Sequence, residues 1–276
     1  LQPKIEAYAK ENNLLVHHIL PNGKVISIVG FDAKGKPEYK QTDNLGAAIT
    51  ISTNKVYPNT SLANNYNLTG RGFRVGEWDG GTIRITHSEY QGRAVQADNG
   101  TLALSEHATH VGGTLIAAGI NPNAKGMAYQ ANLLANDWGN DDGEMAIRAS
   151  QGLLISNHSY GTPSGWDDDG VTWHGDNAVN DTYDYKFGFY ESRARDWDNI
   201  AFKAPYYLIV KSAGNSRGQG GNNAQHPANG KYDCIPTYSV AKNILTVGAV
   251  EKVANGFTNP AGVKMSTFSS WGPADD

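Results

Sequence analysis

The chain has 276 residues, enough for one large α/β domain or for a domain with an appendage. Its formal net charge of −4 argues against a nucleic-acid partner, because phosphates require a basic face, and no apolar run is long enough to span a membrane. The single cysteine, Cys234, excludes an intrachain disulfide and a multi-cysteine zinc site, and we expect its thiol to be a buried structural group.

The first 60 residues are expected to form a small extension of helix plus hairpin. Residues 3–12 have the pattern of a short helix, and two β-rich runs, 14–20 and 24–31, flank the hairpin signal Pro21-Asn22-Gly23. Residues 32–60 are polar and rich in turn residues, which indicates an extended lead-in. A remnant of a pro-segment and a packing extension of the main domain explain the region equally well.

From residue 61 to residue 276, short apolar runs alternate with helical stretches. This alternation is typical of an α/β fold with a mostly parallel central sheet and helices on both faces. The chemistry of such sheets lies at the carboxyl ends of the strands. The predicted strands cover residues 73–78, 131–136, 153–157, 206–211 and 244–250, and the predicted helices cover residues 106–118 and 187–203.

Three polar residues stand at the ends of these elements. Asp79 follows the first predicted strand, His107 opens the first helix, and Asn215 follows the strand at 206–211. A carboxylate beside a histidine is what a general base needs, and an asparagine amide at a strand end can donate to an oxyanion. Taken singly, Asp79 and Asn215 are more simply explained as turn residues. His107 and His110 could bind a metal, but the zinc-peptidase spacing of four residues around a glutamate is absent.

Together these segments resemble the sequence blocks of the subtilisin family of serine peptidases, the subtilases. Residues 107–114, HATHVGGT, resemble the family's HGTHVAGT block, with Gly112 in place of its alanine. Residues 75–81, VGEWDGG, resemble the strand-end Asp-Thr/Ser-Gly block, with Gly80 where a hydroxyl residue is usual. The resemblance runs from about residue 70 to the end and implies a subtilisin-like fold.

The resemblance also assigns roles to residues. It makes Asp79 and His107 members of an Asp-His-Ser triad and makes Asn215 the oxyanion donor. The residues that it implies along an extended peptide substrate are Trp138, Gly139, Ser159, Tyr160 and Gly161.

The nucleophile is expected beyond this sequence. Family members carry it in a Gly-Thr-Ser-Met-Ala block after a Phe-Ser-Ser-x-Gly-Pro segment, which is residues 268–273 here, and the sequence stops at Asp276 before such a block. The resemblance therefore implies a serine endopeptidase whose catalytic domain is incomplete in this chain and which is inactive alone. Three explanations are open: a complementary C-terminal chain that carries the serine, a truncation, and an orphan fragment without activity. The complementary chain is favoured, because a domain cut before its central helix would expose much apolar surface. The alternative function is a non-catalytic, peptide-binding subtilase-like module.

The chemistry of this family requires no cofactor. Structural calcium could bind the acidic clusters at residues 140–143 and 167–170, although neither has the spacing of a known calcium loop. A metal-dependent hydrolase built on Asp79, His107 and His110 is a third and weaker alternative. The resemblance implies a polypeptide substrate and a secreted or cell-surface protein.

Overall fold

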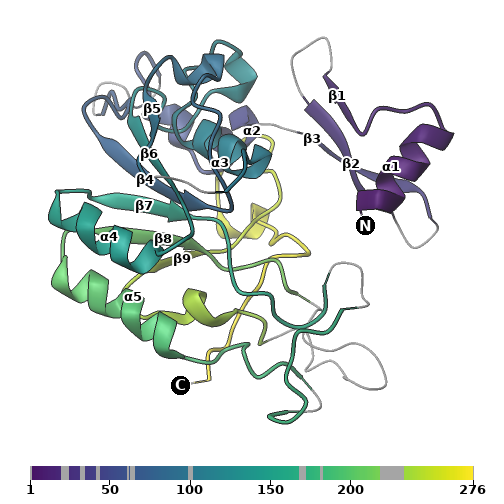
Figure 1. Ribbon diagram of the computed structural model, residues 1–276. Coiled ribbons are helices and arrows are strands. Elements are labelled where there is room, and N and C mark those ends of the chain that lie inside the picture. Colours follow the sequence, from purple (N-terminus) through teal and green to yellow (C-terminus); the bar gives the residue numbers. More distant parts are fainter. Residues whose placement is uncertain are drawn as a thin grey trace.

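The main body of the protein is built on a six-stranded sheet. The computed structural model describes residues 2–19, 25–31, 35–41, 44–60, 62, 66–98, 102–167, 172–180, 183–217 and 233–275. Every pair of neighbouring strands in the sheet is parallel, and the order is β5-β6-β4-β7-β8-β9 (Figure 1), which confirms the predicted α/β fold. The strands are β4 (Arg74–Asp79), β5 (Ala94–Gln96), β6 (Asn132–Asp137), β7 (Ile155–His158), β8 (Leu208–Ser212) and β9 (Leu245–Val247).

Helices lie on both faces of this sheet. On one face α3 (Glu106–Ile116) packs Ala108 and Ile116 into a core with apolar residues of β4, β5 and β6. On the other face α4 (Asp141–Ser150) and α5 (Ser192–Lys203) bury Met145 and Trp197 against Trp78. As a result β4 is buried on both faces over its last five residues. The helices of the two faces are seen on opposite sides of the sheet in Figure 1.

Among the residues that the structure describes, the second half of the sheet is covered by helices on one face only. Side chains that alternate toward α4 and α5 are buried, whereas those that share the face of α3 are exposed or half-buried. The strand register places these exposed residues on one continuous surface. They are Ile155 (36% exposed), Leu208 (39%), Leu245 (48%) and Val247 (46%).

The extension at the N-terminus has a small core of its own. Helix α1 (Gln2–Glu11) packs on a three-stranded antiparallel sheet of β1 (His17–Ile19), β2 (Val25–Phe31) and β3 (Pro37–Gln41), which stands beside the main body in Figure 1. Its buried residues are Ile5, Ala9 and Ile28. The predicted helix and the pairing of the first two strands are confirmed, while the turn at residues 21–23 lies outside the described residues.

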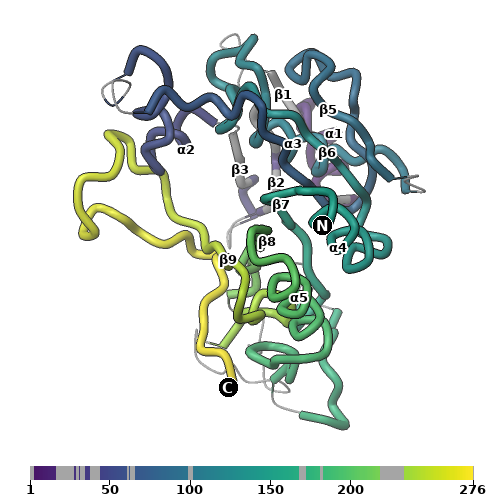
Figure 2. The backbone as a smooth tube through the Cα atoms, turned by 90° about the vertical axis from the view of Figure 1, so that its left-hand side faces the viewer, coloured from purple at the N-terminus to yellow at the C-terminus, as the bar shows by residue number. Residues whose placement is uncertain are grey.

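The expectation of an extended lead-in over residues 32–60 is wrong. The chain adds β3 to the hairpin and then forms α2 (Asn44–Thr50) and a 3₁₀ turn at Thr53–Lys55. Helix α2 and the turn form where the segment packs on the main body: the Tyr57 hydroxyl donates to the carbonyls of Gly126 (3.2 Å) and Met127 (3.1 Å). The C-terminal segment, yellow in Figure 2, reaches α2, where the Val253 amide donates to Thr50 Oγ1 at 3.0 Å. The domain division at residue 60 stays a prediction.

Candidate active site

The parallel sheet brings the predicted site residues to one edge. All six strands run in the same direction, so the segments that follow β4, β6, β7 and β8 emerge together at their carboxyl ends. The register pairs Asp79 with Asp137 and aligns Trp78, His158 and Lys211 across the sheet. The residues that follow these positions at the same edge are Trp138, Gly139, Ser159, Tyr160, Gly161 and Asn215.

Asp79 and His107 are in direct contact at this edge. Their Oδ1 and Nδ1 atoms lie 2.7 Å apart, within the range expected for a general base and its orienting carboxylate. Asp79 is buried, and its Oδ1 also accepts from the Gly80 amide at 2.7 Å. His107 is exposed and lies in the first turn of α3, where Ser105 caps the helix by accepting from the Ala108 amide at 3.1 Å. The acidic side chain is therefore fixed and the histidine faces solvent.

The carboxylate changes the acid–base behaviour of the histidine. The hydrogen bond that His107 donates to Asp79 raises the pKa of His107, and partial burial opposes this shift. Asp79 Oδ2 is buried and accepts no hydrogen bond from the residues that the structure describes, so His107 and Gly80 are the groups that meet this charge. His107 can take up a proton at Nε2 while its Nδ1–H keeps its hydrogen bond to Asp79.

In the described part of the chain, no group of three His, Cys, Asp or Glu side chains is placed to hold a metal ion, and this search includes Asp141, Asp142, Asp167 and His110. Residues 141–143 open helix α4, so the expected acidic loop at 140–143 is wrong, and acidic side chains suit a helix N-terminus. Asp167 pairs with His174 at 2.7 Å, while residues 168–170 lie outside the described residues. Calcium binding stays a prediction.

Three buried side chains explain why residue 112 is a glycine. A Cβ atom at Gly112 would lie 2.6 Å from the Tyr90 hydroxyl, 2.7 Å from Leu133 Cδ2 and 2.8 Å from Glu77 Oε2. Glu77 is fully buried two residues before Asp79, and burial followed by the charge of Asp79 raises its pKa well above the usual value. Glu77 could not be recognised from the sequence, because only the packing of β4 against α3 brings its carboxyl beside residue 112.

Gly112→Ala is expected to lower the free energy of unfolding by about 1 kcal/mol. Alanine would gain up to about 1 kcal/mol of helix propensity, but the new methyl must displace buried groups, one of which, the Tyr90 hydroxyl, is held by the Thr109 carbonyl at 2.7 Å. Urea denaturation measures the loss. In a Glu77→Ala background the same change should cost less, because one of the three close contacts is gone, and an equal cost in both backgrounds would show that Glu77 makes no part of the clash.

Gly80 is also explained by its surroundings. A Cβ atom there would lie 2.6 Å from the Trp138 ring. Trp138 is 48% exposed and meets Tyr160 edge-to-face with ring centroids 5.7 Å apart. The two aromatic side chains thus come from the segments after β6 and β7 that the sequence analysis assigned to substrate binding. Gly161 has open space at its Cβ position, and Asn215 is exposed.

Other groups near this edge have structural contacts. Lys211 is buried and donates to the carbonyl (3.0 Å) and hydroxyl (2.9 Å) of Ser212, and burial lowers its pKa to about 7. The sequence analysis did not identify it. Ser269 and Ser270 are buried, and their hydroxyls accept from backbone amides at 2.9 Å. Cys234 is buried, as expected, and its Sγ accepts from the Trp271 amide at 3.4 Å.

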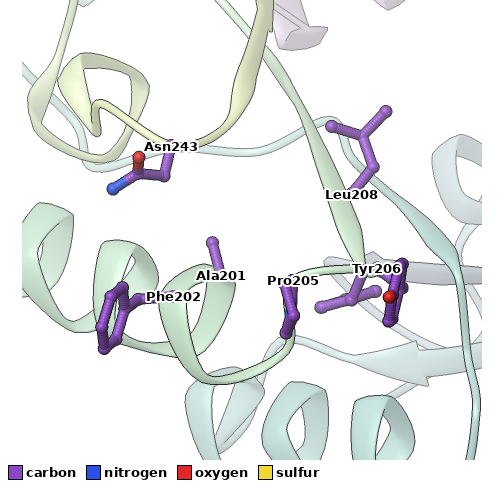
Figure 3. Close-up of a pocket in the computed structure, with 7 residues that line it drawn as sticks. Ala201, Phe202, Pro205, Tyr206, Leu208 and Asn243 are labelled. Atoms are coloured by element: carbon purple, nitrogen blue, oxygen red, sulfur yellow. The ribbon is translucent and has the colours of Figure 1, made fainter.

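The pocket drawn in Figure 3 is separate from this edge. It holds about 320 Å³ and is lined by residues such as Phe202, Pro205, Tyr206 and Leu208, from the end of α5 and the start of β8. Because β8 begins where the parallel sheet has its amino edge, this pocket lies at the opposite end of the strands from Asp79.

The comparison with family profiles agrees with the sequence blocks that follow residue 85. The profile of the subtilase family, Peptidase_S8, matches residues 85–276, which contain His107 and Asn215, while Asp79 precedes the match. No curated protein matches the sequence. One solved structure that resembles the chain is the self-cleaved protease domain of PatA, with 22% identity and a TM-score of 0.45 over 74% of this chain and 64% of that one. A cold adapted subtilisin-like serine proteinase has 18% identity and a TM-score of 0.44 over 80% of this chain and 66% of that one. The Clostridium perfringens CspB protease has 20% identity and a TM-score of 0.40 over 60% of this chain and 40% of that one.

The matched region spans less than two thirds of each of these three proteins. No helix among the described residues is long and apolar enough to cross a membrane. The family profile covers well over half of the sequence. This chain belongs to the subtilase family of serine peptidases.

Proposed function

We propose that this chain supplies the acid–base pair and the oxyanion donor of a serine endopeptidase whose nucleophile lies beyond residue 276. The observation that carries the proposal is the contact of 2.7 Å between His107 Nδ1 and Asp79 Oδ1 at the carboxyl edge of the sheet. A buried carboxylate on Nδ1 and an exposed ring on the other side is the arrangement in which imidazole acts as a base toward a hydroxyl.

In this mechanism His107 moves one proton in each half of the reaction. The serine hydroxyl attacks the peptide carbonyl while His107 Nε2 takes its proton, and Asp79 stabilises the imidazolium. Asn215 donates to the oxyanion that forms. His107 then gives the proton to the leaving amine, which breaks the peptide bond and leaves an acyl ester. In the second half, water attacks the ester while His107 takes the water proton. His107 then returns this proton to the serine oxygen, which releases the carboxylic acid and restores the serine hydroxyl.

The uncovered half of the sheet supports a complementary C-terminal segment. Leu208, Leu245 and Val247 present apolar side chains on one surface, on the face that α3 shares. An exposed apolar surface of this kind favours burial against another segment of protein. We assign the surface to the central helix that follows the Phe268–Pro273 segment in the family and that carries the serine. This segment is either the continuation of the chain or a separate, tightly held chain.

The remaining features of the proposal follow from the family. The substrate is a polypeptide that lies along Trp138, Gly139 and residues 159–161. The chemistry needs no cofactor, so activity should persist after chelation and dialysis, apart from any loss of a structural calcium. The protein acts outside the cytosol, at the cell surface or in the medium.

Labelling with a fluorophosphonate tests the function. The full-length product of the gene should hydrolyse a polypeptide and react with the probe at one serine beyond residue 276, whereas residues 1–276 alone should do neither. His107→Ala should abolish both activities in the full-length protein. The matched control is His174→Ala, which breaks another histidine–aspartate pair of 2.7 Å in the loop between β7 and α5.

Two results would contradict the proposal. Labelling of a serine within residues 1–276 would show that the nucleophile is misassigned. A full-length protein that binds peptides but neither cleaves them nor reacts with the probe would be the non-catalytic binding module.

A further inference from the structure

A hydrogen bond joins the segments that follow β6 and β7 at the carboxyl edge of the sheet. The Tyr160 hydroxyl donates to Asp141 Oδ2 at 2.6 Å. Tyr160 follows β7, whereas Asp141 opens α4 three residues after Trp138, which follows β6. Strand β4, with Asp79 at its end, lies between β6 and β7 in the sheet. The bond therefore bridges the segments on the two sides of the strand that carries Asp79.

Asp141 is built into a fixed position. It is 6% exposed, and its Oδ1 accepts from the Asp142 amide at 2.9 Å while Oδ2 accepts from Tyr160. A carboxylate that accepts hydrogen bonds in a buried place holds its donors more strongly than a neutral oxygen does. Burial, followed by Asp141, raises the pKa of Tyr160 well above its usual value, so the hydroxyl keeps its proton.

A chain of buried hydrogen bonds supports Tyr160 from the other side. His158 Nδ1 lies 3.1 Å from the Tyr160 hydroxyl, and His158 Nε2 lies 2.7 Å from Ser156 Oγ. Ser156 Oγ in turn lies 2.5 Å from the Tyr207 hydroxyl. His158 is completely buried, stacked on Trp78 with ring centroids 5.3 Å apart. This chain of hydrogen bonds thus runs through the core beneath Tyr160.

The donor of each hydrogen bond in this chain can be assigned by starting at Asp141. A carboxylate only accepts, so the Tyr160 proton points to Asp141 and the Tyr160 oxygen must accept from His158 Nδ1–H. His158 is neutral because burial, followed by the charge of Lys211, lowers its pKa well below the usual value. Its Nε2 then accepts from the Ser156 hydroxyl. The Tyr207 hydroxyl donates to Ser156, so that every hydrogen bond of the chain is donated toward Asp141.

We propose that Asp141 and Tyr160 are positioning residues that fix the segment after β6 against the segment after β7, and that His158, as its Nδ1–H tautomer, holds Tyr160 in place. The assignment of these two segments to substrate binding rests on the proposed function. A peptide that extends along both segments gains from their fixed relative position, because no binding energy is used to order them. A small ester that occupies only the reacting centre does not touch them.

Tyr160→Phe in the full-length protein tests the proposal, because it keeps the ring and its contact with Trp138 and removes only the hydroxyl. KM for a peptide of six or more residues should rise about tenfold, the loss of one hydrogen bond to a charged group, while kcat for a small ester stays within twofold. Asp141→Asn, which keeps an acceptor oxygen, should recover most of the affinity that Asp141→Ala loses. The matched control is Tyr190→Phe, which removes a similar bond of 2.7 Å to Asp198 of α5 and should leave both constants unchanged.

Nitrogen NMR of His158 is a readout that does not depend on activity. The wild-type ring should carry its proton on Nδ1, and Tyr160→Phe should produce a mixture of the two tautomers. A wild-type proton on Nε2, or an unchanged KM for long peptides in Tyr160→Phe, would overturn the proposal while peptidase activity stands. If no variant cleaves peptides, their dissociation constants replace KM: a tenfold rise in Tyr160→Phe keeps the positioning role while the catalytic function fails, and an unchanged constant overturns the role.

Discussion

Asp79→Asn in the full-length protein is expected to lower kcat about 10⁴-fold. Asp79 Oδ1 accepts the His107 Nδ1 proton at 2.7 Å, whereas an asparagine can turn its NH₂ group to the ring and favour the tautomer with the proton on Nε2. That tautomer cannot take the proton of the serine. Folding should change little, because the amide has the shape of the carboxylate and its oxygen can still accept from the Gly80 amide.

The pH dependence of kcat/KM gives a second measure of the same substitution. In the proposed mechanism the base form of His107 is the active one, and Asp79 raises its pKa above the 6.5 of free imidazole, so the acid limb of the wild-type profile should lie above pH 6.5. In Asp79→Asn the limb should move to lower pH, because the charge that favours imidazolium is gone. A loss of less than tenfold in kcat with an unmoved acid limb would exclude Asp79 from the reaction.

The parts of the fold that the sequence predicted are those with continuous local patterns. The buried strand that ends at Asp79 and the small-residue helix that begins near His107 were both predicted within two residues of their observed ends, because each has an apolar core and a polar boundary. Strand β5 was missed: it has three residues, Ala94–Gln96, and its pairing with β6 is a long-range contact with no local pattern.

Helix α4 was missed for a different reason. Its first turn, Asp141-Asp142-Gly143, has the composition of a turn, and a glycine that close to a helix start indicates a break. What stabilises the helix is tertiary packing: Met145 is fully buried against the sheet, and Trp78 Nε1 donates to Glu144 Oε2 at 2.9 Å. Neither contact can be predicted from residues 140–150 alone.

The candidate site divides in the same way. The order of the sequence blocks led to Asp79, His107 and Asn215, which the fold brings to one edge. The pairs that support them cannot be predicted from local sequence, because each joins residues of different elements: Glu77 with Gly112, Gly80 with Trp138, and Asp141 with Tyr160. Gly112 and Gly80 look like mild departures from the family blocks until the structure shows which side chain occupies the space of the missing Cβ.

Asn215→Ala in the full-length protein is expected to lower kcat by about 10²–10³-fold with KM nearly unchanged, which is the loss found when the equivalent kind of donor is removed from subtilisin. The side-chain amide meets its partner only as charge develops on the carbonyl oxygen, so its loss raises the transition state and leaves substrate binding almost untouched. Steady-state kinetics with one peptide substrate give both constants.

Stability separates this role from that of a turn residue. The loop around Asn215 is held by backbone contacts on each side of it: the Gly214 carbonyl accepts from the Ser270 amide, and the Ser216 amide donates to Ser270 Oγ, both at 2.9 Å. Asn215→Ala removes neither bond, so the melting temperature should stay within about 2 °C of the wild type. Ser270→Ala is the matched control, because it removes a loop contact and should lower both the melting temperature and kcat. If Asn215→Ala instead melts lower and keeps its kcat, Asn215 only shapes the turn after β8.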